Sequence, residues 1–158
     1  MNLTFKPLTK ADAKTVVSWR YADEYSIYNM DAEDIDNEAD YLMNPDNHYY
    51  GIYSDTDLIG HAVFHDEGRV AGGDYSAIAL DIGAGMRPDW TGQGKGADII
   101  ASIIDFGRET YQASTFRATI ASWNLRAQKA TTNNGFTEIS RFKATNSGKE
   151  FIIFMRAD

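Results

Sequence analysis

The stretch Gly-Gln-Gly-Lys-Gly at residues 92–96 has the residue types of an anion-binding loop. Its glycines allow φ > 0 and leave no Cβ between the backbone N–H groups and a bound anion. The apolar run at residues 99–104 predicts a helix directly after the loop, and the first N–H groups of a helix carry partial positive charge. Lys95 adds a full charge. These features predict a phosphate site; the alternative is a tight strand-to-helix turn without a ligand.

The spacing of the glycines argues against two common phosphate loops. The nucleoside-triphosphate loop needs Gly-x-x-x-x-Gly-Lys-Ser/Thr, but here Gly96 follows Lys95 and Asp89 occupies the place of the first glycine. The dinucleotide fingerprint fits only in its relaxed form, with Ala97 in the last position, and the first half of the chain lacks the βαβ unit that this fingerprint requires. A nucleotide-binding regulator is therefore the weakest interpretation.

A strand predicted over residues 76–86 precedes the loop and carries one carboxylate, Asp81. Side chains alternate along a strand, so one face holds Ile78, Leu80, Ile82, Ala84 and Met86. The other face holds Ala77, Ala79, Asp81, Gly83 and Gly85. Apart from Asp81, this second face is made of small residues, which let a ligand or another backbone approach closely, and paired glycines are typical of a bulge.

The rest of the chain alternates between strand and helix patterns. Apolar periodicity and turn residues predict strands over residues 3–8, 48–53, 58–64, 115–120, 136–142 and 150–155, and helices over residues 10–21, about 33–43, 94–111 and 124–133. The order strand, helix, strand, helix, strand in the second half indicates a mixed α/β sheet. Because no repeat or linker interrupts the pattern, we expect residues 1–158 to form a single domain.

The composition predicts an ordinary cytoplasmic protein. A net charge of −8 disfavours binding to nucleic acid. No apolar run is long enough to span a membrane, and the N-terminus lacks the apolar run of a secretion signal, so no membrane partner is expected. The chain has no cysteine, and its three histidines show no metal-ligand spacing, so no metal is expected.

Two motifs together resemble those of the GNAT superfamily of N-acetyltransferases. The acetyl-coenzyme A loop of that family, Gln/Arg-x-x-Gly-x-Gly/Ala, is similar to residues 91–96, although Thr91 stands in the Gln/Arg position. The family's second motif, Asn-x-x-Ala followed by Gly-Phe, is similar to residues 124–127 and 135–136, with twelve residues from Asn124 to Phe136. Both motifs occur in the family's order and on the expected elements.

The resemblance implies an α/β fold of the α+β type, with acetyl-coenzyme A as co-substrate. Its mixed, mostly antiparallel sheet would have about seven strands, with helices on both faces, and would splay at the acetyl-coenzyme A site. The backbone of Ala84, Gly85 and Met86 would bind the pantetheine arm, and the Met86 N–H would polarise the thioester carbonyl. The pyrophosphate would be held by Thr91, Gly92, Gln93, Gly94, Lys95 and Gly96. Asn124 would contact the pantetheine or its phosphate end.

The resemblance also implies an enzyme that moves an acetyl group from acetyl-coenzyme A to a primary amine of a small molecule or peptide. Asp81 occupies the place where some members carry a glutamate base, and its shorter side chain would act through a water molecule. The alternative for Asp81 is a structural role, either an ion pair with a strand neighbour such as Arg117 or a hydrogen bond to a bulge amide. Many members have a tyrosine where this chain has Thr131, a poor acid. The rival function is a non-catalytic acyl-coenzyme A-binding or sensing domain.

In the family the two early helices roof the acceptor site. The candidates in this region combine aromatic rings with a carboxylate, a set that can hold an ammonium group: Trp19, Tyr21, Glu24, Tyr25 and Tyr28. Ordinary core packing is the alternative. Nine Asp and Glu residues, and no basic residue, lie between positions 21 and 46, which indicates either a solvated helix face or a rim that attracts a cationic acceptor. The oligomeric state stays open, a homodimer included.

Overall fold

The computed structural model describes residues 2–158, which divide into two compact units. Unit 1 consists of the chain up to Val63 together with Ala84–Thr91, and unit 2 consists of Phe64–Gly83 and Gly92–Asp158. Strand β4 (Leu80–Met86) belongs to both, since residues 80–83 lie in unit 2 and residues 84–86 in unit 1. The single-domain assignment of residues 1–158 stays a prediction.

Within residues 2–158 there are six further strands and four α-helices. The strands are β1 (Leu3–Lys6), β2 (Tyr49–Ser54), β3 (Asp57–Phe64), β5 (Thr115–Ala121), β6 (Thr137–Lys143) and β7 (Glu150–Ala157). The helices are α1 (Lys10–Ser18), α2 (Ile35–Met43), α3 (Gly96–Tyr111) and α4 (Leu125–Thr132). The strand order is β1-β2-β3-β4-β5-β7-β6, in which β4 and β5 are parallel and the other described pairings are antiparallel. This mixed, mostly antiparallel seven-stranded sheet confirms the predicted fold class.

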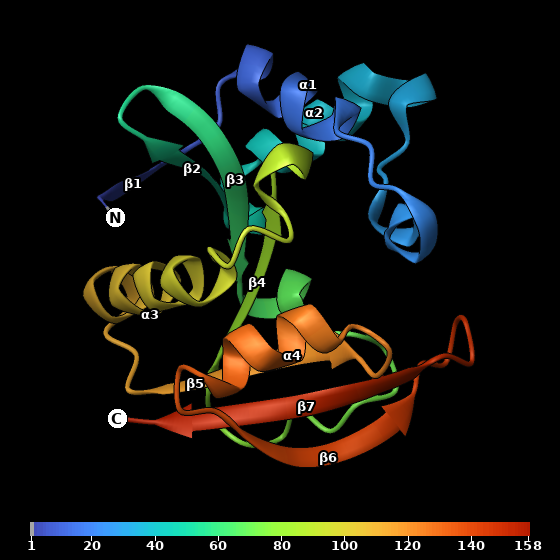
Figure 1. The fold of residues 1–158 in the computed structure, drawn as a ribbon, viewed down its shortest axis with the longest axis vertical. Coiled ribbons are helices and arrows are strands. Elements are labelled where there is room, and N and C mark those ends of the chain that lie inside the picture. The colour runs from blue at the N-terminus through green and yellow to red at the C-terminus, as the bar shows by residue number, and fades with distance from the viewer. Residues whose placement is uncertain (1) are drawn as a thin grey trace. The chain divides into compact units, whose positions relative to one another are not determined.

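In unit 1, α1 and α2 lie side by side and enclose a small apolar core (Figure 1). The hydroxyl oxygen of Thr9 accepts a hydrogen bond from the Asp12 N–H at 3.2 Å and so caps the start of α1. The core consists of Leu8, Ala13, Val16, Val17, Trp19, Ala39 and Leu42. The helix predicted over residues 10–21 ends earlier, at Ser18, because the backbone of Trp19 (φ −59°, ψ 139°) turns away from the helical region.

The hairpin of β2 and β3 is tighter than the sequence predicts. Ser54 pairs with Asp57, which leaves a turn of two residues, Asp55 and Thr56, where the strand patterns predict a turn over residues 54–57. Asp55 adopts a positive φ of 53°, a conformation that two-residue hairpin turns require and that Asp tolerates better than most residues.

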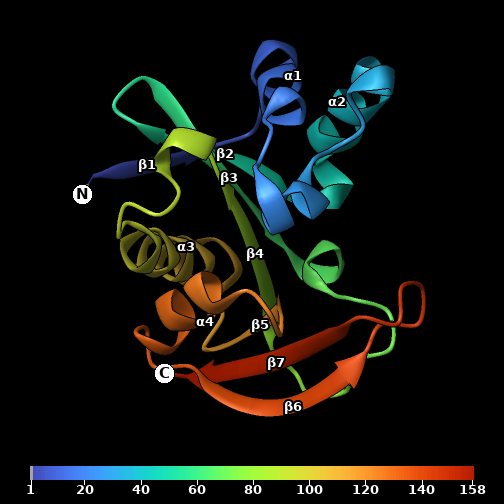
Figure 2. The same ribbon diagram turned by 45° about the vertical axis from the view of Figure 1, so that its right-hand side comes forward.

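In unit 2, α3 packs on the sheet and on α4, as Figure 2 shows. The buried side of α3 consists of Ile99, Ile103, Ile104 and Gly107. Gly107 allows the closest approach, since a Cβ at this position would lie 2.9 Å from the Leu80 side chain and 3.2 Å from Phe116. Glycine at this point therefore sets how closely the helix can approach β4 and β5.

The strand predicted over residues 76–86 begins four residues later, at Leu80. Ile78, expected on the apolar face, is 97% exposed. The preceding segment bonds to side chains instead of to a strand, because the Arg117 guanidinium donates to the Ala77 carbonyl at 2.9 Å and the Asp74 carboxylate accepts from the Ser76 N–H at 3.0 Å. Alternation of residue types alone does not reveal this competition for the backbone.

Candidate functional site

The glycine-rich loop of unit 2 has the backbone conformation expected of it. Gly92 and Gly94 have φ values of 69° and 73°, in the left-handed region that glycine adopts at little cost. A Cβ at Gly94 would meet no heavy atom within 4 Å. Lys95 precedes the first residue of α3, and its side chain does not cap the helix. The loop therefore leads directly into the electropositive end of a sixteen-residue helix.

Unit 2 brings the two sequence motifs together at the contact between α3 and α4. A Cβ on Gly96 would lie 3.2 Å from the Ala130 Cβ, so the third glycine of the loop permits close helix packing. The Asn134 side-chain amide donates to the carbonyls of Ala97 and Ala130, each at 2.9 Å, and thereby links the start of α3 to the end of α4. Gly135, with φ 82°, completes the turn after α4.

A cation that the sequence analysis did not include lies against the loop. A Cβ on Gly92 would be 3.0 Å from a guanidinium nitrogen of Arg126, which projects from the first turn of α4. The signal was its position, since Arg126 follows Asn124 by two residues in the second motif. Thr91, in unit 1, uses its hydroxyl locally and donates to the Pro88 carbonyl at 2.6 Å. The family's loop motif has Gln or Arg at the position of Thr91. In this chain, Arg126 of unit 2 lies beside the loop instead.

Asn124, which precedes α4, and Thr131, within it, each make a local hydrogen bond. The Asn124 side-chain oxygen accepts from the Ala127 N–H at 3.2 Å and caps the helix, and only 8% of the residue is exposed. Thr131 is 1% exposed, and its hydroxyl donates to the Ala127 carbonyl at 2.8 Å, four residues back along the helix. Because the Thr131 hydroxyl already donates its hydrogen bond to the helix backbone, it is poorly placed to act as an acid, as the sequence suggests.

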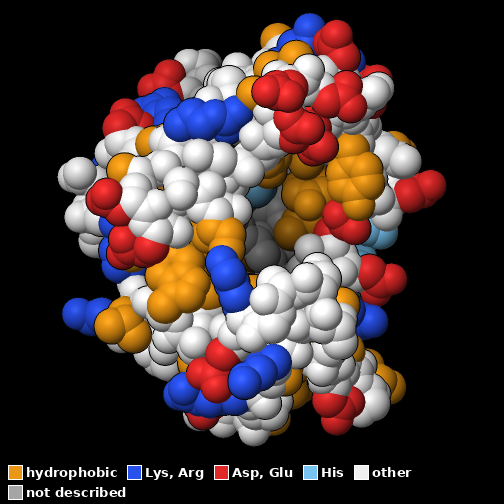
Figure 3. Space-filling view, turned by 90° about the vertical axis from the view of Figure 1, so that its right-hand side faces the viewer, with side chains coloured by type: hydrophobic (Ala, Val, Ile, Leu, Met, Phe, Trp, Pro, Cys, Tyr) orange, Lys and Arg blue, Asp and Glu red, His pale blue; other side chains and the backbone are white. Residues whose placement is uncertain are grey.

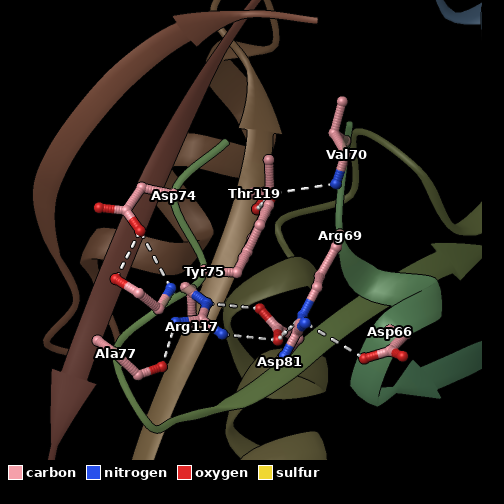
Figure 4. A network of polar contacts seen from close by, with 10 residues as sticks. Asp66, Arg69, Val70, Asp74, Tyr75, Ala77, Asp81, Arg117 and Thr119 are labelled. Atoms are coloured by element: carbon pink, nitrogen blue, oxygen red, sulfur yellow. Dashed lines mark hydrogen bonds and ion pairs between the residues drawn. The ribbon is translucent and has the colours of Figure 1, made fainter. Parts of the chain in front are cut away.

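Asp81 lies in a polar network at the start of β4, drawn in Figure 4. Arg117 donates from Nε to Oδ1 at 2.7 Å and from Nη2 to Oδ2 at 2.9 Å, and both side chains are 1% exposed. Arg69 donates a third hydrogen bond to Oδ2 at 2.8 Å. The ion pair with Arg117, one of the two roles left open by the sequence, is therefore present. Both carboxylate oxygens accept hydrogen bonds from guanidinium groups, which hold the Asp81 carboxylate in a fixed orientation.

Tyr75 braces the same network. Its ring lies 4.9 Å from the Arg117 guanidinium carbon and 5.3 Å from that of Arg69 (Figure 4). Its hydroxyl is hydrogen-bonded with the Thr119 hydroxyl at 2.9 Å and accepts from the Val70 N–H at 2.9 Å. The cluster therefore ties the segment before β4 to the β4–β5 pair.

The parallel ladder between β4 and β5 is short. It pairs residues 80–82 with residues 116–118, and residues 83–86 of β4 lie beyond it. Ala84, in the second half of the strand, is exposed. The predicted pantetheine-binding residues therefore belong to the part of β4 that continues past this ladder.

In unit 1, the end of β4 contacts β3 and Tyr21. A Cβ on Gly60 would lie 2.8 Å from the Gly85 carbonyl oxygen, so the two strands approach closely at glycines. The Tyr21 hydroxyl donates to the Met86 carbonyl at 2.6 Å, and burial raises the pKa of Tyr21 to about 12. Tyr21, predicted as an acceptor-binding residue, and Met86, predicted to bind the thioester, are thus in direct contact.

The other predicted acceptor residues are divided between core and surface. Trp19 is 9% exposed and belongs to the core of unit 1, as the packing alternative expected. Glu24, Tyr25 and Tyr28 lie on a 3-10 helix, Asp23–Tyr28, where Glu24 is exposed and Tyr28 is 44% exposed. The Tyr21 N–H donates to the Asn29 side chain at 2.8 Å and closes this segment into a loop.

Some carboxylates of the acidic stretch, residues 21–46, form ion pairs with lysines of α1. Asp36 is 3.0 Å from Lys14, and Asp40 is bonded to Lys10, so two carboxylates of α2 join it to α1. These lysines lower the pKa of Asp36. Figure 3 shows a group of Asp and Glu side chains near the top of the face that it draws, on the side where the segments after α1 lie in Figure 1. On the 3-10 helix that carries Tyr25 and Tyr28, Asp23 and Glu24 are exposed, so unit 1 presents carboxylates next to these predicted acceptor residues in the chain.

Residues 2–158 lack the features of two other kinds of site. They contain no group of three or more His, Cys, Asp or Glu side chains that could hold a metal ion. Over the same residues, no helix combines the length and the apolar character needed to cross a bilayer.

Comparisons with known proteins agree with this architecture. The family model described as "Acetyltransferase (GNAT) domain" matches residues 2–137. An acetyltransferase (GNAT family) from Bacillus anthracis has a TM-score of 0.76 and 16% identity, with 99% of this chain and 95% of that chain covered. A spermidine N-acetyltransferase chimera from Vibrio cholerae and hSSAT has a TM-score of 0.75 and 14% identity, with 99% and 96% covered. An N-acetyltransferase from Campylobacter jejuni, in complex with acetyl coenzyme A, has a TM-score of 0.69 and 16% identity, with 99% of each chain covered. No curated protein matches the chain.

Proposed function

The chain belongs to the GNAT family of acetyltransferases, and we propose that it transfers the acetyl group of acetyl-coenzyme A to a primary amine. The observation that carries this proposal is the loop at residues 92–96. Two of its glycines adopt positive φ, and the third packs α3 against α4. Solved structures of similar fold include one with acetyl coenzyme A bound, which supports the same co-substrate here.

The pyrophosphate would bind to backbone N–H groups of residues 91–96 and to Lys95. Arg126 would supply the guanidinium that this family usually places at the position of Thr91, because its terminal nitrogen already lies against Gly92. A guanidinium makes charge-assisted hydrogen bonds to phosphate oxygens in pairs, which a threonine cannot do. Asn124 caps α4 two residues before Arg126 and would contact the pantetheine or its phosphate end.

The thioester would bind to the backbone of residues 84–86. The Met86 N–H would donate to the thioester carbonyl and stabilise the negative charge that develops on its oxygen during attack. Tyr21 supports this role, since its hydroxyl fixes the Met86 carbonyl at 2.6 Å and so orients the strand end. Asp81 would have an indirect role, because its carboxylate accepts hydrogen bonds from Arg117 and Arg69 and holds both side chains in place.

The acceptor would be a cationic amine drawn in by the acidic surface of unit 1. Glu24 and Tyr28 are exposed, and an aromatic ring beside a carboxylate can hold an ammonium group. One protein of similar fold is named for spermidine, which is an amine of this kind. The ammonium group first loses a proton to water, and the neutral nitrogen attacks the acetyl carbon and forms the C–N bond. The nitrogen then gives a second proton to a proton acceptor, the C–S bond breaks, and coenzyme A leaves as a thiolate.

A second candidate is an acyl-coenzyme A-binding protein that does not catalyse transfer. It is favoured by one observation: the two side chains expected at the family's base and acid positions, Asp81 and Thr131, are both committed to internal hydrogen bonds. Both the acetyltransferase and the binding protein would bind coenzyme A, but only the acetyltransferase would acetylate an amine.

A thiol-release measurement separates these functions. Wild-type protein is mixed with acetyl-coenzyme A and, in turn, spermidine, glucosamine and a lysine-containing peptide, and binding of coenzyme A is measured by calorimetry. Amine-dependent thiol release supports the enzyme. Saturable binding without release for any amine supports the binding protein.

A matched pair of glycine variants tests the loop. Gly94→Glu introduces a negative charge where the anion is proposed to bind, and affinity for coenzyme A should fall by at least about tenfold. Gly148→Glu is the control, since Gly148 has nearly the same φ, 71° against 73°, and equally open surroundings. Equal affinities for the two variants would place the pyrophosphate elsewhere.

A further inference from the structure

His61 lies directly against the end of β4 in unit 1. A Cβ on Gly85 would be 2.3 Å from the His61 Nε2 atom, so the imidazole occupies the space that any other residue at position 85 would fill. The ring is flanked by Trp19 at 6.4 Å and Tyr49 at 6.2 Å, measured between ring centroids. The imidazole therefore lies between the rings of Trp19 and Tyr49 on one side and the backbone at Gly85 on the other.

The same imidazole has an unused polar atom. Among the described residues, His61 Nδ1 is the buried side-chain nitrogen or oxygen that has no hydrogen-bond partner. Leaving such an atom unpaired is unfavourable, so a buried unpaired nitrogen is a position where a hydrogen-bonding partner is expected. Burial lowers the pKa of His61 to about 4, so the ring is neutral near pH 7 and keeps a lone pair.

Other polar side chains near β4 are already engaged. The Tyr21 hydroxyl donates its proton to the Met86 carbonyl, and both oxygens of Asp81 are bonded to arginines. His61 differs from both, because its ring is neutral and its buried Nδ1 atom has no hydrogen-bond partner among the described residues.

We propose that the imidazole of His61 binds the acceptor amine beside the thioester and takes the proton that the amine loses. This inference rests on the proposed function, in which residues 84–86 bind the thioester. As the C–N bond forms, the nitrogen becomes positively charged and therefore acidic, so a neutral imidazole can accept its proton. The C–S bond then breaks, the coenzyme A thiolate takes up a proton from water, and His61 releases its own proton to water.

The test compares His61→Gln with His48→Asn in the presence of acetyl-coenzyme A and the amine that wild-type protein acetylates fastest among spermidine, glucosamine and a lysine peptide. Glutamine keeps a polar side chain but cannot take up a proton. We expect kcat to fall at least about 100-fold for His61→Gln, while the Kd for coenzyme A stays within about threefold. His48 is a suitable control because its φ of 58° is tolerated by asparagine, and this variant should keep wild-type kcat.

A measurement on the wild-type protein removes any dependence on how the variant folds. The ring resonances of His61 are followed by NMR while coenzyme A and then spermidine are added. A shift on adding the amine supports the contact, and unchanged ring resonances overturn it. Wild-type kcat in His61→Gln also overturns the inference and leaves the proposed function intact. Wild-type protein that acetylates none of the amines overturns the proposed function itself, and the inference with it.

Discussion

Asp81, on β4 in unit 2, and His61, which contacts Gly85 at the end of β4 in unit 1, are two titratable groups with opposite surroundings. Asp81 is a fully buried charge with three hydrogen bonds from two guanidinium groups. His61 is a neutral ring with aromatic neighbours and an unpaired nitrogen. A buried charge persists only when it is paired, so in the first arrangement each charged group depends on its partners. A neutral group with unused hydrogen-bonding capacity is free to act on a ligand, so the second is suited to chemistry.

Removing the partner of Asp81 should have the largest effect on stability. Arg117→Met leaves Asp81 buried with part of its charge uncompensated, and the free energy of unfolding should fall by about 3–5 kcal/mol. Urea unfolding followed by circular dichroism measures the change. The double variant Asp81→Leu, Arg117→Met, which removes both charges, should recover part of the loss. A loss below about 1 kcal/mol for Arg117→Met would mean that the pair is not structural.

Acid should destabilise the protein through His61. The folded pKa of about 4 lies below the ordinary value of about 6.5, so between these pH values the unfolded chain binds a proton that the folded chain does not. The free energy of unfolding therefore decreases as pH falls from 6.5 to 4, by up to about 3 kcal/mol from this group. Unfolding of wild type and His61→Gln at several pH values tests this, since the variant should lose that part of the slope. Equal slopes would contradict the low pKa.

Adding a methyl group at Gly85 should disturb His61 selectively. Gly85→Ala would place its Cβ on the imidazole, and overpacking of this kind costs about 1–3 kcal/mol. The double variant Gly85→Ala, His61→Ala should be less unstable than the sum of the single changes, because the clash disappears with the ring. Thermal unfolding of the four proteins measures the coupling. Strict additivity would show that the two residues do not touch.

The smallest expected effect concerns Arg126. Arg126→Gln should weaken coenzyme A binding by about tenfold, or about 1.4 kcal/mol, through the loss of a phosphate contact. Calorimetry with coenzyme A and dephospho-coenzyme A locates that contact, since equal weakening for both ligands identifies the pyrophosphate. Lys129→Gln, which removes an exposed charge further along α4, should leave affinity unchanged. Weakening for coenzyme A alone would assign Arg126 to the 3′-phosphate.

The part of the site built from backbone could be predicted from the sequence. Gly92 and Gly94 adopt positive φ because glycine is the residue that does so at little cost, and their spacing identifies the loop directly. The ion pair of Asp81 with Arg117 could be named as an alternative, because both residues lie on predicted strands of one sheet. Most strand and helix bounds were predicted to within a few residues for the same reason, since apolar periodicity is a local property.

The part built from side chains of distant segments could not be predicted. The contact of His61 with Gly85 depends on how β3 lies against β4, which no local pattern specifies. Arg69 reaches Asp81 from an irregular segment whose path is set by tertiary contacts. Ile78 fitted the strand alternation and is nevertheless exposed, because hydrogen bonds from Asp74 and Arg117 hold the backbone around it.

Acetyl transfer itself is tested most directly by mass spectrometry of the amine. Wild-type protein is incubated with acetyl-coenzyme A labelled with carbon-13 in the acetyl group, together with spermidine, glucosamine and a lysine-containing peptide. We expect at least one amine to acquire the labelled acetyl group in amounts equal to the coenzyme A thiol released, and His61→Gln to form this product far more slowly. Saturable binding of acetyl-coenzyme A with no labelled amine would contradict acetyl transfer and identify an acyl-coenzyme A-binding protein.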